Sequence, residues 1–485
     1  MSTKKISSIE IILWLIAVVL VIVSLSPFAL GFKIKSDYAI FVEELSELSQ
    51  LDIQLLEYDQ GFFSSQATLS VNIQDVPEQL QFKEDIIHGP VYFGLIGQGK
   101  SPLVAAVIKG QLAVSTSQKQ FVNKIFAGKN PLVYQTIIDF SGAMTSQAYI
   151  PSVNARFEDE YGPVHIQSAG VIMSETYSMG SGQLNGELQM PTFKVKSGLL
   201  DVHAESINVS FSGSMGGNDI LLGDSVVSVN LLDVDSGDEQ FAVRDLVIRS
   251  ASSESAGLIN SNTRINAREF LASNQKFGPL AFNVSVNGLN AEGLNQIQDI
   301  QSEADEKLQQ GVPPEQVNAM MTGQIMGVMP DLIKQAEVQI NPLSIDSELG
   351  KLEADLDFTL DGIDADAPAD LMFLLGAISL DLNFSIDEAL LKQFISWELE
   401  NNAQADAAVG SAKNQQIESK IPLDQKVSEN IQGMLDENWL LMNEGVYLSK
   451  ISMHQGELMI NDKPVDPMQQ IMSSMGGGAG GVYAP

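Results

Sequence analysis

The segment from Gly94 to Ser101 is the closest match in this chain to a motif that carries out chemistry. Its sequence, GLIGQGKS, satisfies the pattern G-x-x-x-x-G-K-[ST], in which backbone N–H groups surround phosphates, the lysine reaches the outer oxygens and the hydroxyl binds Mg²⁺. Such a loop needs a strand before it, a helix after it and a parallel sheet around it. A strand over 91–96 and a helix from Pro102 would fit, but residues 112–114 return to a strand-like pattern. We therefore interpret the segment as a glycine-rich loop that ends a strand.

Other residues that could catalyse a reaction or bind a metal are dispersed along the chain. The sequence contains neither an HExxH motif nor a G-x-S-x-G elbow. Ser64 or Ser65 could act with His88 as nucleophile and base, although nothing in their spacing favours it. The four histidines are far apart in the sequence and form no close pair of metal ligands; they are His88, His165, His203 and His454. We therefore predict no catalytic, cofactor-binding or metal-binding residue.

Two residue types leave metal binding open as an alternative. Acidic stretches at 233–239 and 361–370 offer hard oxygen ligands that suit Ca²⁺, but the first one lacks the glycine and glutamate spacing of an EF-hand. We interpret both stretches as solvated turns. Thioethers can bind Cu(I), but methionines at helical spacing more often fill a core or form an apolar contact surface. These methionines are Met320, Met321, Met326, Met329, Met468, Met472 and Met475.

An uncharged run from Ile11 to Leu30, IILWLIAVVLVIVSLSPFAL, is long enough to cross a bilayer. A helix of about 20 residues spans roughly 30 Å, the hydrocarbon thickness of a membrane. A cleaved signal peptide is the alternative, but its apolar core usually has about 7–15 residues and ends at a small-x-small site, which is absent here. Lysines flank the run on both sides, so charge does little to set its orientation. We predict an uncleaved anchor within residues 1–35, with a cytoplasmic N-terminus and the rest of the chain outside the cytoplasm.

Composition narrows the class of protein further. The chain has 485 residues, a net charge of -34 and no cysteine. Such an acidic surface repels nucleic acid, so we expect no nucleic-acid partner. The absence of cysteine removes disulfides, thiolate metal sites and cysteine nucleophiles. The roughly 450 residues after the anchor suffice for two or three domain-sized cores, which burial alone must stabilise.

Alternating polar and apolar residues, the pattern of a half-buried strand, recur through most of the chain. Strands with one apolar and one polar face are typical of antiparallel sheets, and no βαβ rhythm is visible. The clearest examples are residues 66–73, 193–196, 207–211, 227–231, 282–286, 352–360, 378–386 and 446–453.

Apolar residues at helical spacing interrupt this pattern. Residues 36–57 are predicted to form an amphipathic juxtamembrane helix. We predict an α+β fold that is mainly β, with long twisted antiparallel sheets and helical-pair insertions that pack on them. The predicted order is a β-rich region over 58–288, a helical insertion over 289–336, strands over 337–386, a second helical insertion over 387–441, a closing β-hairpin over 442–467 and a flexible Met- and Gly-rich tail over 468–485.

Two groups of residues form motifs at the two ends of the chain. Near the N-terminus they are Tyr58, Gly61, Phe62, Phe63, Ser64, Ser65, His88, Gly89 and Pro90. Near the C-terminus they are Gly445, Tyr447, Gly456 and Asn461. These motifs resemble those of the YdgA-like family of bacterial proteins of unknown function. One departure is Gln60, where the family often has arginine.

The resemblance implies a Gram-negative envelope protein that is anchored in the inner membrane, has a periplasmic body and has no established catalytic residues. Chemistry alone predicts structural roles for the motif residues: Gly61 permits a positive φ before a strand, and Pro90 ends one. A binding role for Tyr58, Ser64, Ser65 and His88 is the alternative.

Three hypotheses for the function follow. The first is a non-enzymatic envelope protein whose concave apolar sheet face binds a hydrophobic ligand such as lipid, because large apolar surfaces are default binding sites. The second is a structural or assembly protein that acts through an envelope-protein partner or through homo-oligomers. The third is an envelope hydrolase, which needs a convergent nucleophile, base and oxyanion site. We expect no cofactor.

Overall fold

The computed structural model describes residues 52–60, 64–72, 79–88, 91–159, 162–178, 181–198, 200–216, 220–237, 240–272, 275–360, 376–408 and 422–466. The predicted anchor Ile11–Leu30, the predicted tail over 468–485 and five motif residues lie outside these ranges. The five are Gly61, Phe62, Phe63, Gly89 and Pro90. Within the described ranges, the helices are too short or too polar to cross a bilayer.

The protein is mainly β, and the registered strand pairs of its described residues are antiparallel. This agrees with the one-sided strands expected from the sequence. The chain divides into two compact units: unit 1 comprises residues up to Ser252 with 270–275 and 301–318, and unit 2 comprises the rest. We describe each unit by itself.

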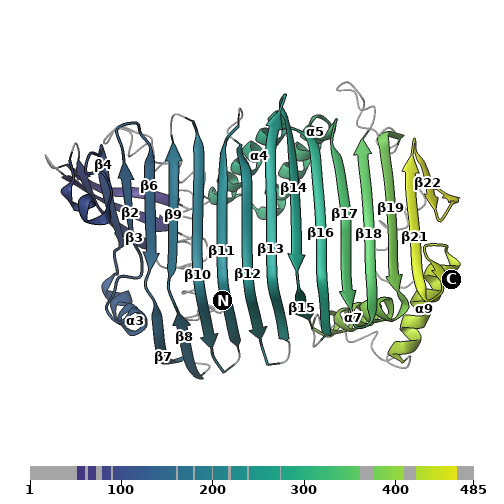
Figure 1. The fold of residues 1–485 in the computed structure, drawn as a ribbon. Helices are drawn as coiled ribbons and strands as arrows, with labels where there is room; N and C mark the ends of the chain where they lie inside the picture. The colour runs from purple at the N-terminus through teal and green to yellow at the C-terminus, as the bar shows by residue number, and fades with distance from the viewer. Residues whose placement is uncertain are drawn as a thin grey trace. The chain divides into compact units, whose positions relative to one another are not determined.

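The elements follow one another along the chain in a simple order (Figure 1). Residues up to Ala272 form β1 (Asp52–Gln60), β2 (Ser64–Asn72), β3 (Leu80–His88), the 3₁₀ helix η2 (Phe93–Gln98), β4 (Ala106–Leu112), α3 (Thr116–Phe126), β5 (Val133–Ile138), β6 (Met144–Ile150), β7 (Val153–Asp159), β8 (Gly162–Ser168), β9 (Val171–Ser178), β10 (Gln183–Lys196), β11 (Asp201–Met215), β12 (Leu221–Asp235), β13 (Gln240–Ser255), β14 (Leu258–Ala267) and β15 (Glu269–Ala272). The later residues form β16 (Gln275–Asn290), α4 (Ala291–Gln309), α5 (Pro314–Ile333), β17 (Glu337–Ser347), β18 (Gly350–Leu360), β19 (Ile378–Asp387), α7 (Glu388–Ala408), α9 (Leu423–Asp436), β20 (Leu441–Asn443), β21 (Val446–His454), β22 (Glu457–Ile460) and β23 (Lys463–Val465).

In unit 1, successive strands pair in the order β1, β2, β3, β4, β5, β6, β9, β10, β11, β12 and β13. The β7–β8 hairpin pairs with the end of β10. Side chains of β3, β4 and β6 alternate between buried and less buried along each strand. Their inward faces meet in one large apolar core that includes Phe82, Ile86 and Ile108.

The helix α3 was not expected from the sequence, although a signal for it is present. Ser115 accepts a hydrogen bond from the Gln118 backbone N–H, and the Gln118 side chain accepts one from the Ser115 N–H. This capping box satisfies two backbone donors at the start of the helix. Phe121 then packs edge-on against Phe157 of β7, so α3 covers part of the core.

The predicted helix over 36–57 is wrong for Asp52–Glu57, because these residues belong to β1. Residues 36–51 lie outside the described ranges. A register shift between Leu55 and Glu57 places a bulge in the pairing of β1 with β2, and it breaks the strict alternation that identifies a strand. Pairing with β2 and burial of Ile53 therefore outweigh the weak helical spacing.

In unit 2, the strands pair in the order β14, β16, β17, β18, β19, β21, β22 and β23. The helices α4 and α5 follow β16 in the chain, within the interval predicted for the first helical insertion. The helices α7 and α9 lie within the second interval and contact each other. At the C-terminus, β20 to β23 form a meander rather than the single closing hairpin that was predicted.

Candidate functional site

A band of apolar side chains crosses the sheet of unit 2. The strand registers align one row of apolar residues, which are Val284, Ile340, Leu356, Leu382 and Ile451. The next row consists of Phe282, Leu343, Ala354 and Phe384. We call these nine residues the apolar band. All nine are half-buried, so this part of the sheet face is neither a closed core nor a polar surface.

Along the direction of the strands, helices lie on both sides of the band: α5 near one end of the strands and α7 near the other (Figure 1). On one side, Ile333 of α5 packs against the buried cluster of Leu360 and Ala377, as does Phe358 of β18. On the other side, Phe394 of α7 stacks on Phe277, with ring centroids 5.9 Å apart and an interplanar angle of 9°. The band is therefore the part of the face that lies between two helix contacts.

The opposite face of the same strands is polar. One of its rows consists of Gln339, Asp357, Asp381 and Ser452. The contrast between the two faces follows directly from the alternation of side chains along a strand. The sequence shows the alternation, but only the registers reveal that the apolar residues line up across five strands.

Unit 1 repeats this pattern on its long strands. Apolar rows cross β10, β11, β12 and β13, and one of them consists of Leu188, Val209, Val227 and Ile248. These four residues are also half-buried. Nearer to β9, the core of unit 1 buries the equivalent positions, for example Met173.

A polar depression lies where α4 begins and α5 ends, and all of its lining belongs to unit 2. Asn290 caps α4, because its Oδ1 accepts a hydrogen bond from the Gly293 backbone N–H at 2.9 Å. The lining residues are Leu258, Gly288, Asn290, Glu292, Gly293, Gln296, Asp331, Lys334 and Gln335. We call this feature the polar depression.

The N-terminal motif brings Ser65 and His88 together. Ser65 Oγ lies 2.9 Å from His88 Nε2, because β2 and β3 pair with Ser65 opposite Ile86. Ser65 is 1% exposed, whereas Ser64 is exposed. Tyr58 pairs with Ala67 on β2. A hydroxyl that a substrate cannot reach is not a nucleophile, so we assign the Ser65–His88 contact to satisfying a buried polar group.

A second buried polar pair lies beside it in unit 1. The Tyr134 hydroxyl donates a hydrogen bond to the Glu84 carboxylate, and the Tyr134 ring lies over Gly110 on the strand between them. Any side chain at position 110 would clash with this ring. Burial, followed by the nearby Glu84 charge, raises the pKa of Tyr134 well above its usual value. No motif or spacing in the sequence indicates this pair.

The phosphate-loop pattern does not form a phosphate-binding loop in the structure. Residues Phe93–Gln98 form η2 instead of the expected strand, and Leu95 is fully buried. The Gly99 backbone N–H donates to the Ile96 carbonyl, and the Lys100 N–H donates to the Leu95 carbonyl. Two of the donors that would have to cradle phosphate are therefore used internally, and the next strand, β4, is antiparallel to β3.

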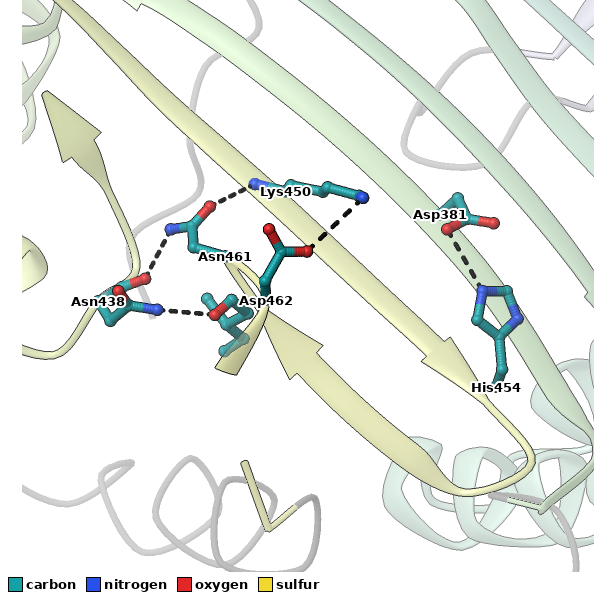
Figure 2. A network of polar contacts seen from close by, with 7 residues as sticks. Asp381, Asn438, Lys450, His454, Asn461 and Asp462 are labelled. Carbon is teal, nitrogen blue, oxygen red and sulfur yellow. Dashed lines mark hydrogen bonds and ion pairs between the residues drawn. The ribbon is translucent and has the colours of Figure 1, made fainter. Parts of the chain in front are cut away.

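The C-terminal motif builds the turns of the meander (Figure 2). Asn461 accepts a hydrogen bond from the Lys450 N–H through Oδ1 at 2.8 Å and donates one to the Asn438 carbonyl through Nδ2 at 2.7 Å. Gly445 and Gly456 occupy turn positions with φ of 85° and 82°, which glycine adopts without strain. These observations assign structural roles to the motif residues.

The motif residue Tyr447 and the histidine His454 lie in the same meander. Tyr447 is buried, and burial followed by the Glu388 charge raises its pKa. On the polar face, His454 bridges β21 to β19. Its Nε2 lies 3.3 Å from Asp381 Oδ1 (Figure 2). Its Nδ1 lies 2.9 Å from Ser379 Oγ. His454 and Asp381 are both about half exposed, so we assign this contact to cross-strand pairing.

Among the described residues, no three histidine, aspartate or glutamate side chains converge in a way that could hold a metal ion. The acidic stretch at 233–239 begins as the end of β12, and Asp235 Oδ1 accepts a hydrogen bond from the Gly237 N–H there. The stretch at 361–370 lies outside the described ranges. Of the methionines on α5, Met326 is 69% exposed.

The fold and these sites define an antiparallel, mainly β protein whose sheet faces expose aligned apolar rows. The comparison with known sequences likewise finds a family to which no chemistry is assigned. The chain belongs to a family of bacterial proteins of unknown function, DUF945, whose model matches residues 4–468. The YdgA-like name stays a resemblance. No curated protein and no solved structure matches the chain.

Proposed function

We propose that this protein binds the hydrocarbon chain of a lipid on the apolar band of unit 2 and catalyses no reaction. The observation that carries the proposal is the half-buried apolar band between the contacts of α5 and α7, whose side chains keep part of their surface accessible. Exposed apolar surface is unfavourable in water, and extended exposed patches usually mark a binding surface.

The dimensions of the band favour an extended chain over a compact ligand. Strands in a sheet lie about 4.8 Å apart, so a row across β16, β17, β18, β19 and β21 is about 19 Å long. One leaflet of a bilayer has a hydrocarbon thickness of about 15 Å, half of the whole core. A single acyl chain laid across the strands would therefore contact most of one row.

The chemistry of the band also favours hydrocarbon. None of its nine residues has a polar side chain, while the neighbouring row on the other face carries Asp357 and Asp381. Each buried CH₂ group contributes about 0.8 kcal/mol, so a long chain supplies enough free energy to offset the cost of association.

We further propose that the predicted helix Ile11–Leu30 anchors the protein in a bacterial inner membrane, with both units in the periplasm. The long uncharged run and the resemblance to envelope proteins support this location. An anchor would keep the apolar band close to a source of lipid. Without a converging nucleophile, base and oxyanion site among the described residues, binding explains the structure better than hydrolysis.

The test compares two neighbouring residues on opposite faces of β16. Val284→Asp places a charge on the apolar band, whereas Asn283→Asp places the same charge on the polar face opposite Arg264. A fluorescent long-chain fatty acid is titrated into the full-length protein and both variants. We expect Val284→Asp to weaken binding at least about tenfold, because a charge cannot be buried under hydrocarbon, and Asn283→Asp to bind like the wild type.

A third variant guards against a folding defect. Val284→Thr keeps the shape of the side chain and replaces one methyl group with a hydroxyl. Its effect on binding should therefore fall between those of Val284→Asp and Asn283→Asp. Circular dichroism checks that all variants are folded. A wild type that binds no fatty acid, or folded variants that all bind equally well, would overturn the proposal.

A further inference from the structure

Three charged residues that line the polar depression have no ion-pair partner within the part of the chain that the structure describes. They are Glu292 at the start of α4, with Asp331 and Lys334 at the end of α5. Two other helix lysines do form ion pairs, Lys307 with Glu303 and Lys392 with Glu388. Charges of both signs thus share one depression without neutralising each other.

The remaining lining is suited to polar contacts. Gln296 and Gln335 add amide groups, which both donate and accept hydrogen bonds. The Asn290 side chain is already engaged with the Gly293 N–H, so the binding groups of the depression are the three charges and the two glutamines. Such a set suits a ligand that carries one positive and one negative charge.

The depression also lies close to the apolar band. Gly288 in its lining and Val284 in the band belong to the same strand, β16, four residues apart. This separation corresponds to about 13 Å along a strand. On the same side of the sheet, Ile333 near the end of α5 and Phe358 of the next apolar row pack against one cluster formed by Leu360 and Ala377, and α5 ends at the depression.

We propose that the polar depression binds the zwitterionic head group of a phospholipid whose acyl chain lies on the apolar band. Lys334 binds the phosphate, and Glu292 and Asp331 bind the ammonium group. The two carboxylates also disfavour purely anionic head groups, as does the net charge of -34. This proposal rests on the proposed function and adds the class of lipid.

The test measures which lipid the protein takes from a mixed membrane. Full-length protein is incubated with vesicles that contain phosphatidylethanolamine and phosphatidylglycerol in equal amounts, re-isolated, and its bound lipid is quantified by mass spectrometry. We expect phosphatidylethanolamine to predominate. In the double variant Glu292→Gln/Asp331→Asn, the preference should fall about tenfold, as expected for losing hydrogen bonds to a charged group, while total bound lipid is retained.

Two comparisons complete the design. Lys426→Gln removes one positive charge from α9, away from the lining of the depression, and should leave the preference unchanged. Lys334→Gln should reduce total bound phospholipid but not the binding of a fatty acid, which has no phosphate. A wild type that binds both phospholipids equally would overturn this inference alone. A wild type that binds no lipid at all would overturn the proposed function.

If soluble phosphoethanolamine bound as tightly as the whole lipid, the depression would be a site for small phosphate compounds, and the inference would also fail. We expect millimolar phosphoethanolamine to displace little bound lipid, because the acyl chain supplies most of the binding free energy.

Discussion

The inward sheet face of unit 1 and the apolar band of unit 2 both arise from alternating polar and apolar residues, but they are buried to different extents. In unit 1, alternate residues such as Ile86 and Ile108 are buried in a large core. In unit 2, equivalent alternate residues such as Val284 and Leu356 stay half-buried. Two polar pairs, Ser65 with His88 and Glu84 with Tyr134, also lie within unit 1.

This difference separates surfaces that stabilise the fold from surfaces that remain available to a ligand. A buried row contributes its hydrophobic free energy within the protein itself. In a half-buried row, part of the apolar surface is still in contact with water, so a ligand that covers the row would gain the remaining hydrophobic free energy. The buried motif residue Ser65 of unit 1 belongs to the first kind of surface, whereas the half-buried apolar band of unit 2, like the row across β10 to β13 of unit 1, belongs to the second.

Truncation of the two rows tests this distinction most strongly. Ile86→Ala should destabilise unit 1 by about 2–5 kcal/mol, because it leaves a cavity in a closed core. Leu356→Ala should cost only about 1 kcal/mol, because its site is open. Urea unfolding with hydrogen exchange, which assigns each transition to a unit, measures both. Equal costs would mean that the apolar band is also a closed core.

The buried Tyr134–Glu84 pair should have the next largest effect. Tyr134→Phe removes the donor from a buried carboxylate and should destabilise unit 1 by about 1–3 kcal/mol at neutral pH. The raised pKa of Tyr134 adds a pH dependence. Above about pH 10 the unfolded chain loses the phenol proton and the folded chain keeps it, so the stability of the wild type falls as the pH rises.

Unfolding curves at pH 8 and pH 10.5 test this sign. The difference in stability between the wild type and Tyr134→Phe should shrink at the higher pH, while the other tyrosines titrate in both proteins. A difference that grows with pH would contradict the assigned cause of the shift.

The C-terminal meander should be moderately sensitive. Asn461→Ala removes the side-chain hydrogen bonds to Lys450 and Asn438 and should cost about 1–3 kcal/mol. Asp462→Asn removes only the exposed ion pair with Lys450 and should cost less than about 0.5 kcal/mol. Thermal unfolding compares these adjacent positions, and the account of Asn461 fails if both variants melt alike.

The smallest effect is expected at the phosphate-loop pattern. Lys100→Ala should change neither stability nor nucleotide binding, because the backbone donors of Gly99 and Lys100 are already engaged. Calorimetric titration with Mg-ATP measures this. Binding by the wild type that disappears in the variant would restore the motif as a functional site.

Much of the fold could be predicted from the sequence because alternation is local. Patterns such as residues 352–360 and 378–386 correspond to β18 and β19, and an antiparallel sheet follows from their one-sided faces. The prediction failed at Asp52–Glu57, where a bulge hides the strand, and at α3, which is too short to interrupt the strand pattern clearly.

The candidate site could not be predicted in the same way. Its rows depend on cross-strand register, for example Leu356 opposite Leu382, and register is set by turns and bulges that one sequence does not fix. The polar depression joins Asn290 with Lys334 through the packing of two helices. The motif residues Gly456 and Asn461 lie in turns of the C-terminal meander and do not belong to this site.

The central claim is that hydrocarbon lies across the strands of unit 2. A fatty acid with a photoreactive diazirine in its chain is cross-linked to the full-length protein, and the labelled residues are mapped by peptide mass spectrometry. The account predicts labels on β16 to β19 at residues such as Val284, Leu356 and Leu382. Labels confined to the apolar rows of β10 to β13, or no specific labels at all, would contradict it.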